Sequence, residues 1–322
     1  MVGGLSCQFV KSFGCAIFTV GWQERNLNVT GACGKPFFRP ILPSGDGVGS
    51  RISNGIEARK HSHPWQVFLV NGKQEPYQTC GGSLIDWNNG NASDLVLTAA
   101  HCVVDMSGFD KATVWEEISY AFTRLFNSNV HGPVSNVSNI RIYLGVHDLE
   151  DLSSSVVDVG VSAVAVGEFN KVASYDDLAL VKLEREVPYN EFIQGICLPG
   201  EKKAQPPAEG TCLVTGWGIQ ADGKEANKLQ QVNVQLFKGH VNSPLFRKDR
   251  MLCTRANANN ARPLEGDSGG PLICLKNDTF VLYGVVSFGI ANECQERTDK
   301  DAFMKLTYYL DWLRRTIAGL QA

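Results

Sequence analysis

Short apolar runs alternate with turn residues over most of this chain. The runs at 65–70 (WQVFLV), 140–144 (IRIYL) and 280–286 (FVLYGVV) are rich in β-branched and aromatic residues. Many short strands separated by frequent turns are typical of an all-β sandwich or barrel. The pattern therefore predicts an all-β domain over residues 52–322.

The end of the chain has a different period. Between residues 308 and 317, one helical face carries Tyr309, Leu310, Trp312, Leu313 and Ile317. Such a stripe usually packs against a core, so we expect a C-terminal α-helix without a catalytic role.

The N-terminal residues differ from the rest. A short apolar stretch follows Lys11, which favours a secretory signal peptide at 1–21; the alternative is a disordered or packed N-terminus. Residues 22–51 are rich in Gly and Pro and lack periodicity, which predicts a pro-segment or linker.

Composition narrows the classes of function. The 322 residues are 43% hydrophobic, which suffices for a sizeable core, and carry a net charge of −3. No strongly basic block is present, so neither nucleic acid nor an anionic membrane is expected as a partner. No apolar run is long enough to predict a transmembrane helix.

Cysteine usage points to an oxidising compartment. The chain has ten cysteines, and removal of residues 1–21 would take Cys7 and Cys15 and leave an even number. An even number in an extracellular chain suggests disulfides, although sequence alone does not assign the pairs. Secretion is also compatible with four N-x-Ser/Thr sequons, at Asn28, Asn91, Asn136 and Asn277.

Three motifs carry the candidate chemistry. Residues 266–271 (GDSGGP) contain one serine among glycines, 98–102 (TAAHC) supply a histidine, and 177–183 (DLALVKL) begin with an aspartate. By itself the serine hexapeptide is typical of a turn. A serine hydroxyl is a poor nucleophile until a neighbouring base removes its proton, and the two upstream motifs offer that base and a group to orient it.

In this chain order the motifs resemble those of the chymotrypsin-like serine proteases. Further landmarks are CGGSL at 80–84, GWG at 216–218 and SFG at 287–289, so the resemblance runs from residue 52 to the end. It implies two six-stranded antiparallel β-barrels with the site at their interface. It also implies a secreted endopeptidase that hydrolyses protein or peptide substrates through an acyl-enzyme.

The resemblance assigns the catalytic roles. Ser268 is the nucleophile, His101 is the general base and then the acid, and Asp177 orients the imidazole. Alignment with the Leu-Ala-Leu run selects Asp177 over its neighbour Asp176. Backbone N–H groups of Gly266 and Ser268 form the oxyanion hole.

The resemblance also implies a zymogen. Cleavage after Arg51 would free the amino group of Ile52, which would pair with Asp267 and order the oxyanion loop. The family's usual Val-Gly at this junction is Ser53-Asn54 here.

By the same resemblance, three disulfides are implied: Cys80–Cys102, Cys212–Cys274 and Cys33–Cys197. Cys253 and Cys294 each match a half-cystine whose partner is absent, so they either pair together or remain free thiols.

The specificity pocket departs from the trypsin-like pattern. Alignment places Arg262 at its base and Asp301 on the opposite wall, with Ser287, Phe288 and Gly289 along the substrate wall and mouth. Arg262 could select an acidic side chain through charge-assisted pairing. Alternatively Arg262 and Asp301 neutralise each other and leave a pocket for small or neutral residues. Neither hypothesis favours cleavage after Lys or Arg, so a separate activating protease is expected.

An insertion at about 103–139 follows the histidine directly, so we expect it beside the cleft, in substrate filtering or partner binding. No metal or other cofactor is expected. Val146 precedes His147-Asp148 where calcium-binding members have glutamate, and no zinc-type spacing or phosphate-binding glycine loop occurs.

Two other classes of protein share part of this pattern. A non-catalytic homologue that acts as a secreted binding protein would use the same scaffold, and the altered pocket is its support. An α/β-hydrolase esterase requires the order Ser-Asp-His and is excluded by the order found. The expected partners of the protease are its substrates, an activating protease and protein inhibitors, and a monomer is expected.

Overall fold

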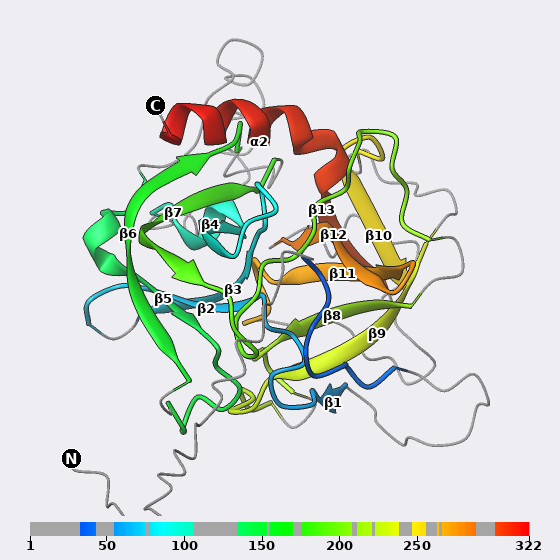
Figure 1. Cartoon of the computed structure of the whole chain (residues 1–322), viewed down its shortest axis with the longest axis horizontal. Coiled ribbons are helices and arrows are strands. Elements are labelled where there is room, and N and C mark those ends of the chain that lie inside the picture. The colour runs from blue at the N-terminus through cyan, green and yellow to red at the C-terminus, as the bar shows by residue number, and fades with distance from the viewer. Residues whose placement is uncertain are drawn as a thin grey trace, which may run out of the picture.

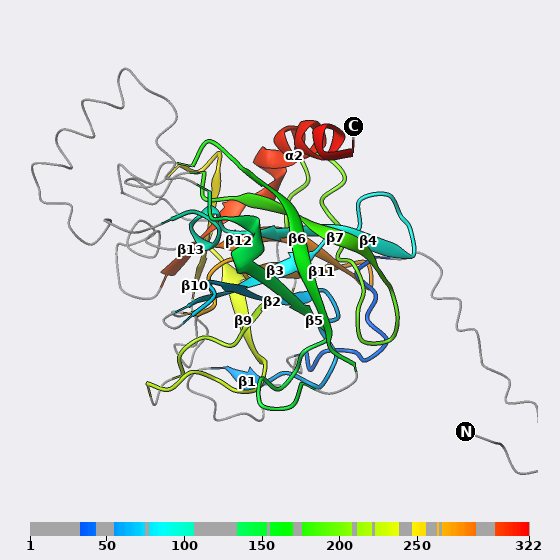
Figure 2. The same ribbon diagram turned by 90° about the vertical axis from the view of Figure 1, so that its left-hand side faces the viewer.

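Two β-barrels lie side by side and a C-terminal helix crosses one end of the pair (Figures 1 and 2). The computed structural model describes residues 33–42, 55–74, 77–105, 134–152, 155–169, 176–207, 211–220, 223–237, 247–255, 263, 266–287 and 300–321. The predicted signal peptide (1–21) and most of the insertion (106–133) lie outside these ranges.

The first barrel is a closed ring of six antiparallel strands in the order β2-β3-β4-β7-β6-β5. Their bounds are β2 Gln66–Asn71, β3 Gln78–Leu84, β4 Ala92–Thr98, β5 Ile140–Leu144, β6 Val157–Val166 and β7 Ala179–Pro188. Two short 3₁₀ helices, η1 (Ala100–Cys102) and η3 (Val137–Asn139), adjoin it. Two of the apolar runs noted in the sequence therefore form strands of this barrel.

The second barrel also closes with six antiparallel strands, since β8 pairs with both β9 and β11. Its strands are β8 Cys212–Gly216, β9 Gln230–Leu236, β10 Met251–Arg255, β11 Pro271–Lys276, β12 Thr279–Val286 and β13 Lys300–Lys305. A two-residue strand, β1 (Ile56–Glu57), adds to β9. The expected pair of six-stranded barrels is confirmed.

Alternation along the strands gives each of them a buried and an exposed face. In β5 the side chains of Ile140, Ile142 and Leu144 are buried while Arg141 between them is exposed, as expected when one face of a strand meets a core. One apolar cluster runs through the first barrel into the second, where Ile273 and Leu282 join it. Burial of this cluster holds the two barrels together.

Helix α2 (Leu306–Gln321) confirms the predicted C-terminal helix. Its buried face includes Tyr309, Leu310, Leu313 and Ile317, which pack against the same cluster. Within the described residues, no helix has both the length and the apolar character needed to cross a membrane.

Disulfides connect distant parts of the chain. Cys33–Cys197, Cys80–Cys102 and Cys212–Cys274 are formed. Cys253 is also disulfide-bonded, so it is not a free thiol; Cys294 lies outside the described residues.

Residues 33–42, which fall in the expected pro-segment, lie against the two barrels. Besides the Cys33–Cys197 bond, Arg39 pairs with Asp278 at 3.1 Å, and the Gln231 side-chain amide donates to the Ile41 carbonyl at 2.6 Å. Residues 33–42 precede Arg51 in the chain, so the Cys33–Cys197 disulfide would keep them attached after a cut at that residue.

A buried histidine lies beside this attachment. The His63 ring is buried, and its Nε2 lies 3.2 Å from Oε1 of the same Gln231. Burial and, to a smaller extent, the nearby His147 lower the pKa of His63 from 6.5 to about 4, although the hydrogen bond with Gln231 acts in the opposite direction. Between about pH 4 and pH 6.5, the His63 imidazole is therefore neutral in the folded protein and protonated in the unfolded chain.

We expect the free energy of unfolding to fall as the pH is lowered from about 6.5 to about 4. The unfolded state binds the His63 proton first, which costs the folded state about 3 kcal/mol by pH 4. Urea unfolding at pH 7 and pH 4.5 measures this loss, with His63→Gln as the comparison because glutamine keeps a donor for Gln231. An equal loss in both proteins would contradict the assignment to His63.

Candidate active site

Strand pairing brings together a histidine and an aspartate that lie 76 positions apart. His101 lies in η1 immediately after β4, and Asp177 lies two residues before β7. Strands β4 and β7 are antiparallel neighbours, with Thr98 opposite Ala179. The end of one strand therefore meets the start of the other, and the two side chains face each other.

The histidine–aspartate pair is buried and fully hydrogen-bonded. Nδ1 of His101 lies 2.8 Å from Oδ2 of Asp177, and the His101 backbone N–H donates to Oδ1 at 2.9 Å. The Ser287 hydroxyl donates to Oδ2 at 2.5 Å. With three donors around the carboxylate, Asp177 holds the imidazole plane and places the proton on Nδ1.

The carboxylate is ionised despite its burial. Burial by itself would raise the pKa of Asp177, but the neighbouring His101 and the hydrogen bonds from His101 and Ser287 hold it below its ordinary value. A charged Asp177 leaves Nε2 of His101 as the basic nitrogen.

The loop that carries Ser268 docks against the first barrel. The Ser268 carbonyl accepts from the Gly81 N–H at 2.7 Å, and the Gly269 N–H donates to the Val286 carbonyl at 2.8 Å. Gly269 has φ +79°, and a Cβ there would lie 2.2 Å from Oγ1 of Thr98. Only glycine permits this close approach, so the loop is held where the two barrels meet.

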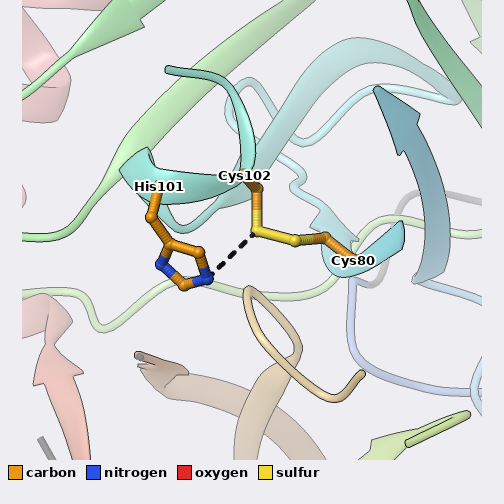
Figure 3. A group of neighbouring side chains, drawn as sticks. All are labelled: Cys80, His101 and Cys102. Atoms are coloured by element: carbon orange, nitrogen blue, oxygen red, sulfur yellow. Dashed lines mark hydrogen bonds between the residues drawn. A yellow bond between two sulfur atoms is a disulfide. The ribbon is translucent and has the colours of Figure 1, made fainter. Parts of the chain in front are cut away.

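One disulfide lies between the histidine and the serine loop. Sγ of Cys102 is 3.7 Å from Nε2 of His101 and 3.8 Å from the Ser268 carbonyl oxygen. Figure 3 shows the imidazole turned toward this sulfur, with Cys80 at the other end of the disulfide. Nε2 of His101 and the backbone of Ser268 are therefore both neighbours of the Cys102 sulfur.

Among the described residues, one group of side chains has the spacing of metal ligands. Cys80, His101 and Cys102 place one ligand atom each within 4.8 Å of one another. However, the two sulfurs are bonded to each other. A thiolate is the form of cysteine that binds metals, and a disulfide provides none. The group does not fit a metal centre.

The Asp267 carboxylate lies over two glycines. Its Oδ1 accepts from the Gly218 N–H at 2.9 Å. A Cβ on Gly216 would lie 2.1 Å from Oδ1, and one on Gly218 would lie 2.6 Å from the carboxylate. Gly216 and Gly218 therefore form a cradle that accepts the Asp267 carboxylate because neither has a side chain. Arg51 and Ile52, the other parts of the expected switch, lie outside the described residues.

The structure leaves most of the expected specificity pocket undescribed. Arg262, Phe288 and Gly289 fall outside the described ranges. The backbone of Asp301 lies in β13 opposite Thr254, and its side chain is not described. Ser287 is described, and its hydroxyl contacts the Asp177 carboxylate; its place along the substrate wall stays a prediction.

Two contacts of the site have no signal in the sequence. The Ser287 hydroxyl reaches Asp177, and Asp176 binds Arg250 and Tyr309 rather than His101. The second contact accords with the choice of Asp177 as the partner of His101. Nothing in the spacing of these residues indicates either contact.

Three of the four sequon asparagines are described, and all three are exposed: Asn91, Asn136 and Asn277. Asn277 lies in the turn between β11 and β12 with φ +49°. Exposure in turns suits glycosylation.

A family model and individual known proteins both match most of the length of this chain. The family described as Trypsin matches residues 52–313. Chymotrypsin-C of Bos taurus is 30% identical over 303 residues, which cover 90% of this chain and 96% of that protein. Chymotrypsin-C of Mus musculus is 29% identical over 303 residues, with the same coverage.

Proposed function

The chain belongs to the trypsin family of serine proteases, and on this premise we propose that it is a secreted serine endopeptidase made as a zymogen. The observation that carries the proposal is the buried His101–Asp177 pair, 2.8 Å between Nδ1 and Oδ2, beside the docked Ser268 loop. A binding homologue has no need to keep an ionised carboxylate buried against an imidazole, since burial of a charge is costly.

The proposed reaction has two halves. Oγ of Ser268 attacks the peptide carbonyl while Nε2 of His101 takes its proton, and Asp177 stabilises the imidazolium. The N–H groups of Gly266 and Ser268 stabilise the oxyanion. Collapse of the tetrahedral intermediate breaks the peptide bond, and His101 returns the proton to the leaving amine. Water, activated by the same imidazole, then hydrolyses the acyl-enzyme and restores Ser268.

Activation is proposed to follow cleavage after Arg51. The new ammonium of Ile52 pairs with Asp267, whose carboxylate already lies over the Gly216 and Gly218 cradle. The loop 266–268 then presents the oxyanion donors of Gly266 and Ser268. The Cys33–Cys197 bond supports a two-chain active form, because it joins the pro-segment to the body.

Secretion, an activating protease, protein inhibitors and a monomeric state complete the proposal. Disulfides such as the three described here persist in oxidising compartments, and exposed sequons suit a glycoprotein.

The test is digestion of a mixed peptide library by protein cut at Arg51, with Ser268→Ala as the matched control. We expect cleavage that is lost in the control. Cleavage after Asp or Glu would assign Arg262 to substrate binding, and cleavage after small neutral residues would mean that Asp301 neutralises it. Cleavage after Lys or Arg would contradict the pocket assignment. An absence of Ser268-dependent cleavage would overturn the proposal in favour of a binding homologue.

A further inference from the structure

The residue before the catalytic aspartate is a second buried carboxylate with an unusual backbone. Asp176 is 6% exposed and has φ +54°, a left-handed conformation that costs non-glycine residues energy. Its carbonyl accepts from the Leu178 N–H at 2.7 Å, so Asp177 lies inside a tight turn. The backbone conformation of Asp176 therefore determines how the following residue, Asp177, is oriented in the turn.

Two side chains from the other end of the chain hold Asp176. The Tyr309 hydroxyl donates to Oδ1 at 2.6 Å, and Nη1 of Arg250 donates to Oδ2 at 2.5 Å. The Arg250 guanidinium also lies 4.9 Å from the centroid of the Tyr308 ring. Both carboxylate oxygens of Asp176 are thus bound by side chains from the second half of the chain.

Helix α2 is fixed to the strand that follows the catalytic aspartate at both of its ends. Tyr309 binds Asp176 near the N-terminus of α2, and Nζ of Lys182 in β7 donates to the Leu320 carbonyl near its C-terminus at 2.6 Å. The Arg250 carbonyl accepts from the Lys305 N–H just before α2. The helix therefore braces β7 and the turn that precedes it.

Charge at this position is balanced. Arg250 neutralises Asp176, and burial together with Asp176 raises the pKa of Tyr309, so its hydroxyl stays a donor. The Arg250–Asp176 pair adjoins a cavity of about 420 Å³. Other ionisable groups line this cavity, namely Glu168, Lys202, Asp249, Lys305, Asp311 and Arg315. Without Arg250, the Asp176 charge would stand directly beside Asp177, where it would favour the protonated form of His101.

From these contacts we infer that Asp176, held by Arg250 and Tyr309, is a positioning residue for the catalytic Asp177, and that helix α2 supports this positioning without touching a reacting atom. This inference rests on the proposed function of the same site. Asp176 touches no reacting atom; it acts through the backbone turn and through its compensated charge.

The test uses variants that separate geometry from charge. Tyr309→Phe removes one hydrogen bond and no charge, and we expect kcat to fall about tenfold with KM unchanged. Arg250→Met leaves Asp176 uncompensated, and the acid limb of kcat/KM should move up by about half a pH unit. Asp176→Asn leaves Arg250 with Asp249, whose Oδ2 lies 3.8 Å from Nε, as its remaining acidic partner and should move that limb down. The double variant Arg250→Met/Asp176→Asn should return it to the wild-type position.

Controls distinguish positioning from general stability. Arg141→Met breaks the exposed Arg141–Asp158 pair on the first barrel and should change neither kcat nor the acid limb. Asp176→Gly permits the left-handed turn without the carboxylate, so it should be more active than Asp176→Ala. Thermal unfolding of each variant verifies that it is folded.

A second readout does not depend on turnover. In a Ser268→Ala background, the NMR titration midpoint of the His101 imidazole, assigned with His101→Gln, should move up in Arg250→Met and return in the double variant. Unmoved midpoints and an unchanged kcat in Tyr309→Phe would overturn the inference. Loss of Ser268-dependent cleavage in the wild type would contradict the proposed function instead, and the titration would still decide the inference.

Discussion

Replacement of Asp177 by asparagine is expected to lower kcat by about 10⁴-fold, the loss that the same change causes in a related triad. The Asp177 carboxylate accepts from Nδ1 and from the backbone N–H of His101. An asparagine that turns its amide toward Nδ1 stabilises the tautomer with the proton on Nε2. That tautomer cannot accept the proton of Ser268, so the geometry survives while the base is lost.

The measurement is kcat and KM on the best library peptide, with protein cut at Arg51. Asp158→Asn is the matched control, because Asp158 is a half-exposed aspartate of the neighbouring strand β6. An Asp177→Asn protein that keeps more than about a tenth of the activity would show that the His101–Asp177 contact does not orient the base.

Arg51→Gln should yield a protein that an activating protease cannot switch on. Before cleavage the Ile52 amino group is part of a peptide bond, so no ammonium is available for Asp267. We expect the oxyanion donors of Gly266 and Ser268 to be misplaced in that state. Loss of even one such donor lowers kcat by about 10²-fold or more, so the uncut protein should show at least that deficit.

Peptide hydrolysis before and after treatment with a trypsin-like protease gives the comparison. Arg59→Gln is the control, since Arg59 lies just downstream and should leave activation intact. N-terminal sequencing of the activated protein should find Ile52. Equal activity of the cut and uncut proteins would exclude the proposed switch. Activation of purified wild type without added protease would contradict the expectation that the enzyme does not cut after arginine.

The sequence by itself determined the architecture and the identities of the candidate catalytic residues. Alternation of apolar and polar positions is a local property, and it predicted strands at 65–70, 140–144 and 280–286 close to β2, β5 and β12. The 3.6-residue stripe predicted α2 for the same reason. The resemblance of three motifs to those of the chymotrypsin-like serine proteases then implied the pair of six-stranded barrels and singled out His101, Asp177 and Ser268, since a serine nucleophile needs both a base and a group that orients the base.

Only the tertiary structure decided which side chains share the site. Pairing of β4 with β7 sets His101 against Asp177, and the closed second barrel brings Ser287 to the same carboxylate. The binding of Asp176 to Arg250 and Tyr309 depends on the final packing of α2. These contacts join residues that lie between 74 and 133 positions apart. Local propensities extend over a few residues, so contacts at such separations are set by strand register and core packing and leave no trace in the spacing of the sequence.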